Sequence, residues 1–97
     1  MTKNKIYRLY TEDKPNLSDL ARGYFDSFTI YKARGYWQGI GEDSAIIEVI
    51  YNEHTPFDTE RQARIGYDME SLALAIKELN HQQAVIITCQ EIETKTV

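Results

Sequence analysis

The sequence predicts a single α+β domain, spanning residues 1–97, in which strands and helices alternate along the chain. Two runs rich in β-forming residues flank a glycine-containing turn between Ser27 and Glu53, which predicts a β-hairpin. A stripe of apolar residues at helical spacing follows the hairpin, and a short β-branched run comes after it. The other segments are therefore expected to pack around the hairpin.

The first expected elements are a strand and a short helix. Lys5 to Tyr10 (KIYRLY) is rich in β-forming residues and predicts a strand, which the proline-containing segment TEDKP ends. A helix is expected from Leu17 to Phe25, because apolar residues recur there at helical spacing. Gly23 weakens that helix by about 1 kcal/mol relative to alanine, so the helix is expected to depend on packing against a sheet.

The hairpin strands are expected from Ser27 to Trp37 and from Ser44 to Asn52. Gln38 to Asp43 supplies the turn, where Gly39 and Gly41 are expected to adopt positive φ.

Alternation along these strands predicts which side chains share a face. Tyr31 and Trp37 fall on one side of the first strand, opposite Ile30. In the second strand, the face that carries Ala45 and Ile47 is expected to meet the helices.

A second helix and a last strand complete the pattern. Five apolar residues step by four, three, four and three from Ile65 to Leu79, so Asp68 to Asn80 is expected to be helical. Asp58 or Thr59 can begin this helix, although Gly66 leaves Thr59 to Tyr67 as either helix or irregular arm. The run AVIITC predicts a strand that continues toward Glu93, before a frayed end.

The resulting order is strand, helix, strand, strand, helix, strand. That order predicts a ferredoxin-like βαββαβ sandwich, in which two right-handed crossovers place both helices on one face of a four-stranded antiparallel sheet. The other face then has no intramolecular cover. We expect it to serve as an oligomer or ligand surface.

The composition limits the partners and the compartment. A net charge of −4 without runs of like charge does not favour binding to phosphate backbones, so nucleic acid is not an expected partner. The single cysteine, Cys89, lies in an apolar run and is expected to be a buried hydrophobe. The chain shows no secretory signal or membrane span, so we expect a cytoplasmic protein that does not bind membranes.

No cofactor or metal site is predicted. The three glycines of GYWQGIG are not followed by Lys-Ser/Thr or by a helix, so they indicate a hairpin turn rather than a phosphate loop. His54 and His81 are far apart in the sequence, and Cys89 has no nearby thiol or imidazole. A Cys- or Ser-based nucleophile motif is also absent from the sequence.

The best binding candidates are Tyr31, Arg34, Tyr36 and Trp37, since these residue types combine large contact area with directional donors. The presence of these four residues is explained equally well if they pack within the sheet and supply the charged side chains of an edge strand.

Two further groups of polar and charged residues are candidates for chemical roles. Glu48, Glu42 and His54 are conceivable acids or bases, but carboxylates on a hairpin are more often solvated or salt-bridged. Arg61, with Arg64, belongs to a solvated helix face or clamps an anionic ligand.

The segment YKARGYWQGIGEDSAIIEVI resembles the long hairpin of PII-like and CutA-like small proteins, in which an aromatic-Trp-x-Gly turn precedes an apolar strand. The resemblance covers about a quarter of the chain. It implies a ferredoxin-like fold, a trimeric assembly and ligands at clefts between subunits.

The leading functional hypothesis is a non-enzymatic binding or regulatory module. It would form a homo-oligomer through its open sheet face and engage a protein or small ligand through Tyr31, Arg34, Tyr36, Trp37, Glu48 and Arg61. Such a protein could also be an inhibitor carried by a mobile element. The alternative is a small dimeric enzyme with a pocket between sheet and helices, where Tyr31, Glu48 or His54 acts as acid or base.

Overall fold

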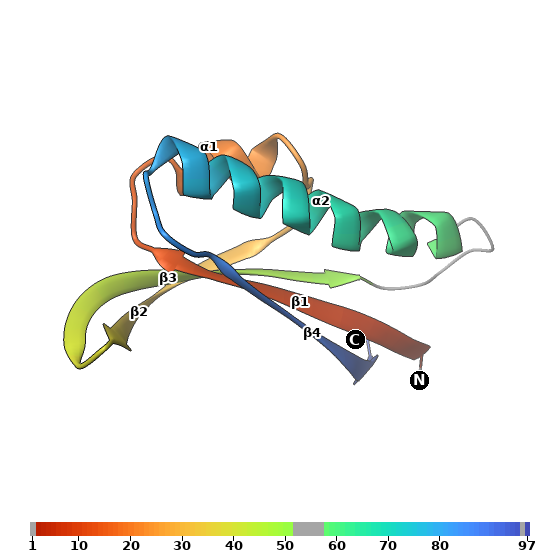
Figure 1. The fold of residues 1–97 in the computed structure, drawn as a ribbon. Coiled ribbons are helices and arrows are strands. Elements are labelled where there is room, and N and C mark those ends of the chain that lie inside the picture. The colour runs from red at the N-terminus through yellow and green to blue at the C-terminus, as the bar shows by residue number, and fades with distance from the viewer. Residues whose placement is uncertain (1, 52–57, 96) are drawn as a thin grey trace.

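The computed structural model describes residues 2–51, 58–95 and 97. The elements follow the predicted order, as Figure 1 shows: β1 (Thr2–Glu12), α1 (Leu17–Arg22), β2 (Thr29–Trp37), β3 (Ile40–Tyr51), α2 (Asp58–Leu79) and β4 (Ile86–Thr94). The predicted α+β class is confirmed.

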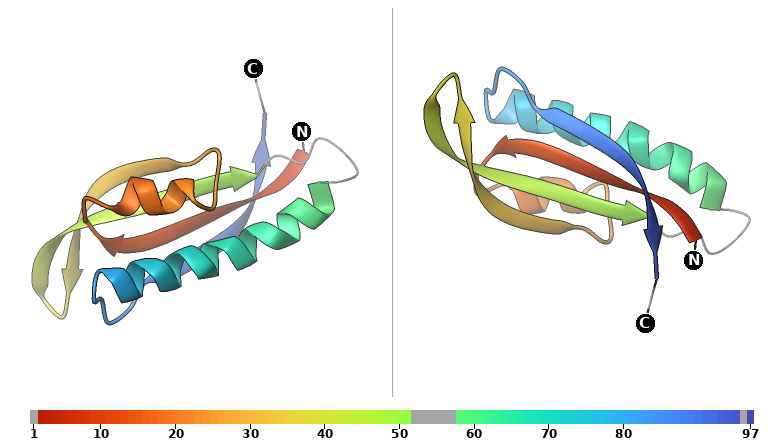
Figure 2. Two further views of the ribbon diagram at one scale, coloured as in Figure 1. Left: turned by 90° about the horizontal axis from the view of Figure 1, so that it is seen from above. Right: turned by 90° about the horizontal axis from the view of Figure 1, so that it is seen from below.

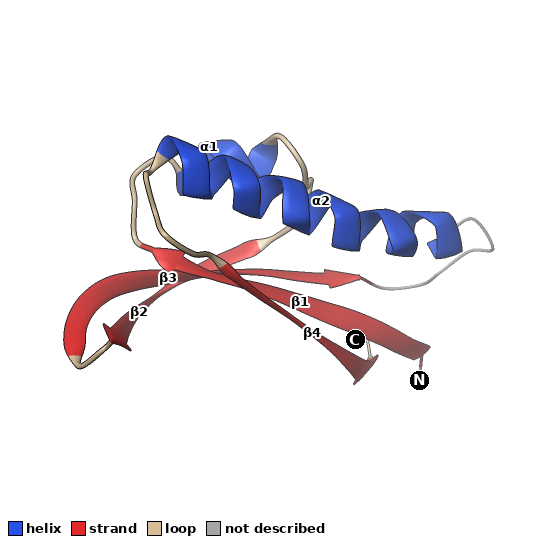
Figure 3. Cartoon of the chain, viewed as in Figure 1, coloured by secondary structure: helices blue, strands red, loops and turns tan. Residues whose placement is uncertain are grey.

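The four strands form one antiparallel sheet in the order β2-β3-β1-β4. Both helices lie on the same face of this sheet (Figures 2 and 3), so the ferredoxin-like arrangement is confirmed. The opposite face, called the open face below, is not covered by any element of the described chain. The β2–β3 hairpin curls away from the helices toward this open face (Figure 1).

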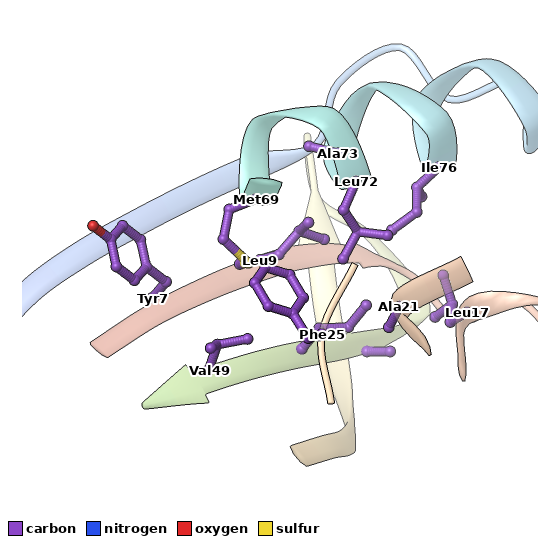
Figure 4. Packing of buried hydrophobic residues seen from close by; sticks show 12 residues of the cluster. Tyr7, Leu9, Leu17, Ala21, Phe25, Val49, Met69, Leu72, Ala73 and Ile76 are labelled. Atoms are coloured by element: carbon purple, nitrogen blue, oxygen red, sulfur yellow. The ribbon is translucent and has the colours of Figure 1, made fainter. Parts of the chain in front are cut away.

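The hydrophobic core lies between the sheet and the helices (Figure 4). The face of β3 that carries Ala45 and Ile47 packs against the helices as predicted, and both side chains are fully buried. Leu9 of β1 pairs with Ile47 across the sheet and contributes to the same layer. Alternation in the strands and the stripe on α2 therefore bury their apolar sides against each other, except at Leu79, which ends the helix and is exposed.

The hairpin turn is tighter than the sequence predicts. Only Gln38 and Gly39 form the loop, with φ of 50° and 81°, whereas Gly41 belongs to β3 and does not have positive φ. Two successive residues with positive φ give a two-residue loop whose backbone twist matches that of the flanking strands. The hairpin is consequently paired up to Trp37 and Ile40.

The helices also differ from the prediction at their ends. α2 runs without interruption from Asp58, so Thr59 to Tyr67 is helical despite Gly66. A Cβ at Gly66 would lie at contact distance from the Tyr7 ring, which places this part of the helix against β1. α1 is shorter than expected and ends at Arg22, although Phe25 beyond it is still buried in the core.

Cys89 is exposed, and the prediction that it is buried is wrong. It lies in β4, an edge strand whose C-terminal half passes out from under α2 (Figure 2). An apolar run of sequence cannot reveal that the strand turns out from under the helix that covers its first part.

Among the described helices, none is long and apolar enough to cross a membrane.

Candidate functional site

A polar cluster joins three strands on the open face. Glu48 in β3 lies opposite Arg8 in β1 and opposite Thr29 in β2. Its carboxylate accepts a hydrogen bond from Arg8 Nε at 2.9 Å and another from the Tyr31 hydroxyl at 2.9 Å. We call Arg8, Tyr31 and Glu48 the open-face cluster.

The cluster keeps Glu48 ionised. Burial of the carboxyl raises its pKa, but the hydrogen bonds from Arg8 and Tyr31 outweigh burial, and the pKa of Glu48 lies below its usual value. The same hydrogen bond to Glu48 is the main cause that raises the pKa of Tyr31. Glu48 is therefore a charged acceptor at neutral pH rather than a proton donor.

Tyr31 and Glu48 both lie on the face away from the helices, so they do not line a pocket between sheet and helices. This differs from the arrangement that the enzymatic alternative requires. His54 lies outside the described residues, as does the side chain of Arg61, whose backbone belongs to the first part of α2.

The hairpin residues are divided between two faces. Trp37 lies on the open face, six residues along β2 from Tyr31 and so about 20 Å away from it. Arg34 and Tyr36 lie on the other face, beside Gly41, where a Cβ would meet both side chains. Arg34 donates to Asp43 at 3.0 Å in an exposed ion pair.

A groove of about 530 Å³ lies at the hairpin end of the sheet. We call it the hairpin groove. It is formed by the end of β1, the tip of the hairpin, the loop between α2 and β4, and the start of β4. Its aromatic side chains are Tyr10, Tyr36 and Trp37, its carboxylates are Glu12 and Glu42, and small residues from the two hairpin strands are Ala33, Gly35 and Ser44.

Two of the small residues of the groove are in close contact with each other. Gly35 and Ser44 lie on neighbouring strands, and a Cβ at Gly35 would collide with the Ser44 hydroxyl. The Trp37 side chain is 53% exposed in a groove that no other described element covers. An exposed indole beside small residues is a surface on which a planar ring can stack.

Gln82 lines the groove and carries a donor without a partner. Its Oε1 accepts hydrogen bonds from the Thr11 hydroxyl at 2.9 Å and from the Glu12 amide at 3.3 Å. Because the Glu12 amide can only donate, it fixes which end of the side-chain amide faces β1. Gln82 is 8% exposed, and its Nε2 has no hydrogen-bond partner. A buried donor of this kind costs about 1–3 kcal/mol until an acceptor reaches it.

The end of α2 holds Gln82 in place. His81 adopts positive φ of 54°, and the Gln82 amide donates to the Lys77 carbonyl at 3.0 Å. This is the pattern of a Schellman end, in which a left-handed residue reverses the chain. The backbone that carries the Gln82 amide is thereby fixed relative to α2.

Sequence reasoning missed Arg8 and Gln82. Alternation along the first strand predicts which residues share a face with Arg8. That Arg8 pairs with Glu48, however, depends on the register between β1 and β3. Gln82 had no signal, since a donor without a partner can be identified only once its neighbours are placed. Among the described residues, no group of three or more His, Cys, Asp or Glu side chains is arranged to hold a metal ion.

The sequence matches no protein-family model and no curated protein. Solved structures do share the fold. A phage SAM lyase in its apo state has a TM-score of 0.68 and 20% identity, over 92% of this chain and 81% of that one. The phage SAM lyase in complex with S-methyl-5'-thioadenosine has a TM-score of 0.63 and 20% identity, over 91% of this chain and 81% of that one.

Two further structures are similar over nearly their whole length. A DUF3240 family protein from Shewanella baltica OS155 has a TM-score of 0.67 and 13% identity, over 100% of this chain and 98% of that one. CPII, a nitrogen regulatory PII-like protein from Thiomonas intermedia K12 bound to ADP, AMP and bicarbonate, has a TM-score of 0.58 and 12% identity, over 99% and 97%. The PII-like resemblance is thereby confirmed at the level of the fold.

Proposed function

We propose that this chain is a small-molecule-binding module and that the hairpin groove holds the adenosine part of its ligand. The observation that carries the proposal is the exposed indole of Trp37 in a groove whose wall includes Gln82, the residue with a buried and unpartnered Nε2. Adenine has a planar face that stacks on an indole, and its ring nitrogens accept hydrogen bonds. The groove therefore offers the stacking face that an adenine base needs, and Gln82 in its wall carries a donor that still lacks an acceptor.

The comparisons lend support of a different kind. The phage SAM lyase was solved with S-methyl-5'-thioadenosine, and CPII with ADP and AMP. These ligands have adenosine in common. For this chain the proposal depends on the residues of its own hairpin groove, because the chain resembles those proteins in its fold.

Adenosine binding is tested by fluorescence and calorimetry. Trp37 is the single tryptophan of the chain, so its emission reports on the groove directly. Adenosine is expected to change that emission saturably. Trp37→Ala is expected to weaken binding, measured by calorimetry, about fivefold or more, because a stacked base contributes about 1–3 kcal/mol. An unchanged emission up to millimolar adenosine would contradict the proposal.

Two variants sharpen this test. Gln82→Glu retains an oxygen for the Thr11 hydroxyl and the Glu12 amide but replaces the Nε2 donor, so it should also weaken adenosine binding. Tyr67→Ala removes an exposed aromatic ring from α2, away from the groove, and should leave the affinity unchanged. Equal losses in Tyr67→Ala and Trp37→Ala would indicate a general effect on the fold.

We further propose that a second copy of the chain covers the open face beyond the groove. Ile50 and Tyr31 are exposed there around the open-face cluster. The charges of Arg8 and Glu48 cancel within that cluster, so two copies can approach without repulsion between these groups.

A cytoplasmic location fits with the exposed thiol of Cys89, which needs a reducing compartment to stay free.

Light scattering tests the association. The wild-type chain is expected to give a mass of two chains or more, and Ile50→Glu a mass of one chain, because it places a charge in the apolar contact. Leu79→Glu, at an exposed position at the end of α2, is the matched control and should keep the wild-type mass. A wild-type mass equal to one chain would overturn the proposal.

A further inference from the structure

The two edges of the sheet differ in how they are protected against a further strand. β2 and β4 are the edge strands, and among the described strands each pairs on one side only. β2 carries Lys32 and Arg34, charged side chains of the kind that hinder strand addition. β4 contains no proline, lysine or arginine, and its first five residues are uncharged. The outer backbone N–H and C=O groups of β4 are therefore the less protected row.

A second groove, of about 390 Å³, lies beside β4. We call it the edge groove. Its helix wall includes Glu70, Leu74 and Lys77, and its strand wall includes Val85 and Ile87. Seen from below in Figure 2, α2 lies alongside β4 on the side away from β1, so a strand added to β4 would run beneath the helix. Leu74 is 57% exposed, so an added strand would find an apolar contact there.

The later part of β4 presents two carboxylates to an added strand. Glu91 and Glu93 lie on the side of β4 that carries Ile87. In the register with β1 they stand opposite Lys5 and Lys3. Among the described residues, neither carboxylate forms an ion pair. Positions directly opposite on neighbouring strands are about 5 Å apart, and opposite charges there stabilise pairing whereas like charges weaken it. Basic side chains on the added strand would continue the alternation of charge across the sheet.

The edge groove also has opposite charges at its two ends. α2 and β4 run in opposite directions (Figure 1), so Lys77 lies toward the start of β4 and Glu70 toward its later part. The two residues are about 10 Å apart along the helix axis. An acidic group therefore suits the Lys77 end, and basic groups suit the end that carries Glu70 and the carboxylates of β4.

We propose that the β4 edge binds an extended, basic peptide segment of a partner protein as an additional antiparallel strand. Backbone hydrogen bonds supply affinity in this mode, and alternate side chains supply specificity. Two basic residues of the peptide lie beside Glu93 and Glu91, and the apolar residues that follow them enter the edge groove beside Leu74. β4 of a second copy suits this position less well, because it would bring further carboxylates and no basic residue.

Fluorescence anisotropy with a designed peptide tests the proposal on the full chain. The probe is a fluorescein-labelled, amidated peptide of sequence RTRTVTLTE, in which arginines, apolar residues and glutamate follow the order of the complementary groups on β4 and α2. Adenosine is left out, because the edge groove and the hairpin groove share Gln83 and Ala84. Saturable binding is expected, and the same peptide with glutamate in place of both arginines should bind about tenfold more weakly or worse. Equal binding of the two peptides, or binding of neither, would overturn the proposal.

N-Methylation of the peptide tests the backbone contact. In an antiparallel pair, one residue directs its N–H and C=O groups toward the neighbouring strand and the next directs them away. A methyl group on one alternate set of amides is therefore expected to abolish binding, and a methyl group on the other set to leave it nearly unchanged. Equal effects of the two sets would contradict strand addition.

Two pairs of variants locate the contact. Leu74→Ala is expected to weaken binding about fivefold or more, because it removes apolar surface from the edge groove. Leu79→Ala makes the same change where the side chain is 60% exposed outside the groove, and should leave the affinity unchanged. Glu91→Gln is expected to reduce the preference for arginine over glutamate in the peptide, whereas the exposed Glu78→Gln on α2 should retain it. Equal effects within either pair would refute the assigned contact.

Light scattering with the unlabelled peptide separates a peptide from a second copy as the occupant. The mass of the wild-type chain is expected to change only by that of the bound peptide. A peptide that dissociates the chain into single copies would show that a second copy, by its β2 or its β4, already occupies the edge, and would overturn the assignment to a partner protein.

Discussion

Leu72→Ala is expected to lower the free energy of unfolding by about 2–5 kcal/mol. Leu72 is fully buried on α2, within the cluster that joins the helices to β1 and β3. Removing its side chain loses the transfer free energy of the missing carbons and leaves a cavity that the neighbours fill only in part. Because the total stability of such a domain is about 5–15 kcal/mol, this single change would remove a large share of it. Urea denaturation followed by far-UV circular dichroism measures the effect.

Leu74→Ala provides the matched control for this prediction. It makes the same chemical change two residues along the same helix, where the side chain is 57% exposed. The expected loss is about 1 kcal/mol or less, since little apolar area is withdrawn from the core. Similar losses in the two variants would contradict the placement of the α2 stripe against the sheet.

The contrast between Leu72 and Leu74 explains why the fold could be predicted from sequence. Helical spacing selects Leu72 and leaves out Leu74, and alternation selects Ile47 and leaves out Ile46. These local periods are enough to assign elements and their buried faces. The order of the elements then leaves few topologies, because crossovers are right-handed and helices must cover a sheet face.

The contacts of the candidate site could not be predicted from these local periods in the same way. Alternation correctly placed Tyr31 and Trp37 on one face of β2, but it does not say which residues of the other strands lie beside them. The partners of Glu48 and Gln82 come from other elements, through register and through the reversal of the chain at His81. Contacts of this kind depend on where strands end and how a loop closes, which composition and spacing do not encode.

Glu48→Gln is expected to lower the free energy of unfolding by about 1–2 kcal/mol at pH 7. The variant keeps the shape of the side chain but removes the charge that Arg8 Nε and the Tyr31 hydroxyl donate to. The Glu48 side chain is only 17% exposed, so the solvent replaces these contacts poorly. Asp43→Asn is the matched control on the same strand, because its partner Arg34 lies at a similar distance but the pair is exposed. Its expected cost is at most about 1 kcal/mol.

The pH dependence of this cost follows from the lowered pKa of Glu48. In the unfolded chain this carboxyl takes up a proton near its ordinary pKa of 4.5, whereas in the folded chain it does so only at lower pH. The stability that its charge contributes is thus fully present above about pH 4.5 and is lost as the pH falls through the folded pKa. The difference between wild type and Glu48→Gln, measured by urea denaturation from pH 7 down to pH 3, should shrink toward the acid end. A difference that stays constant or grows on acidification would mean that Arg8 and Tyr31 do not favour the charged form of Glu48, and that the open-face cluster is held together by shape alone.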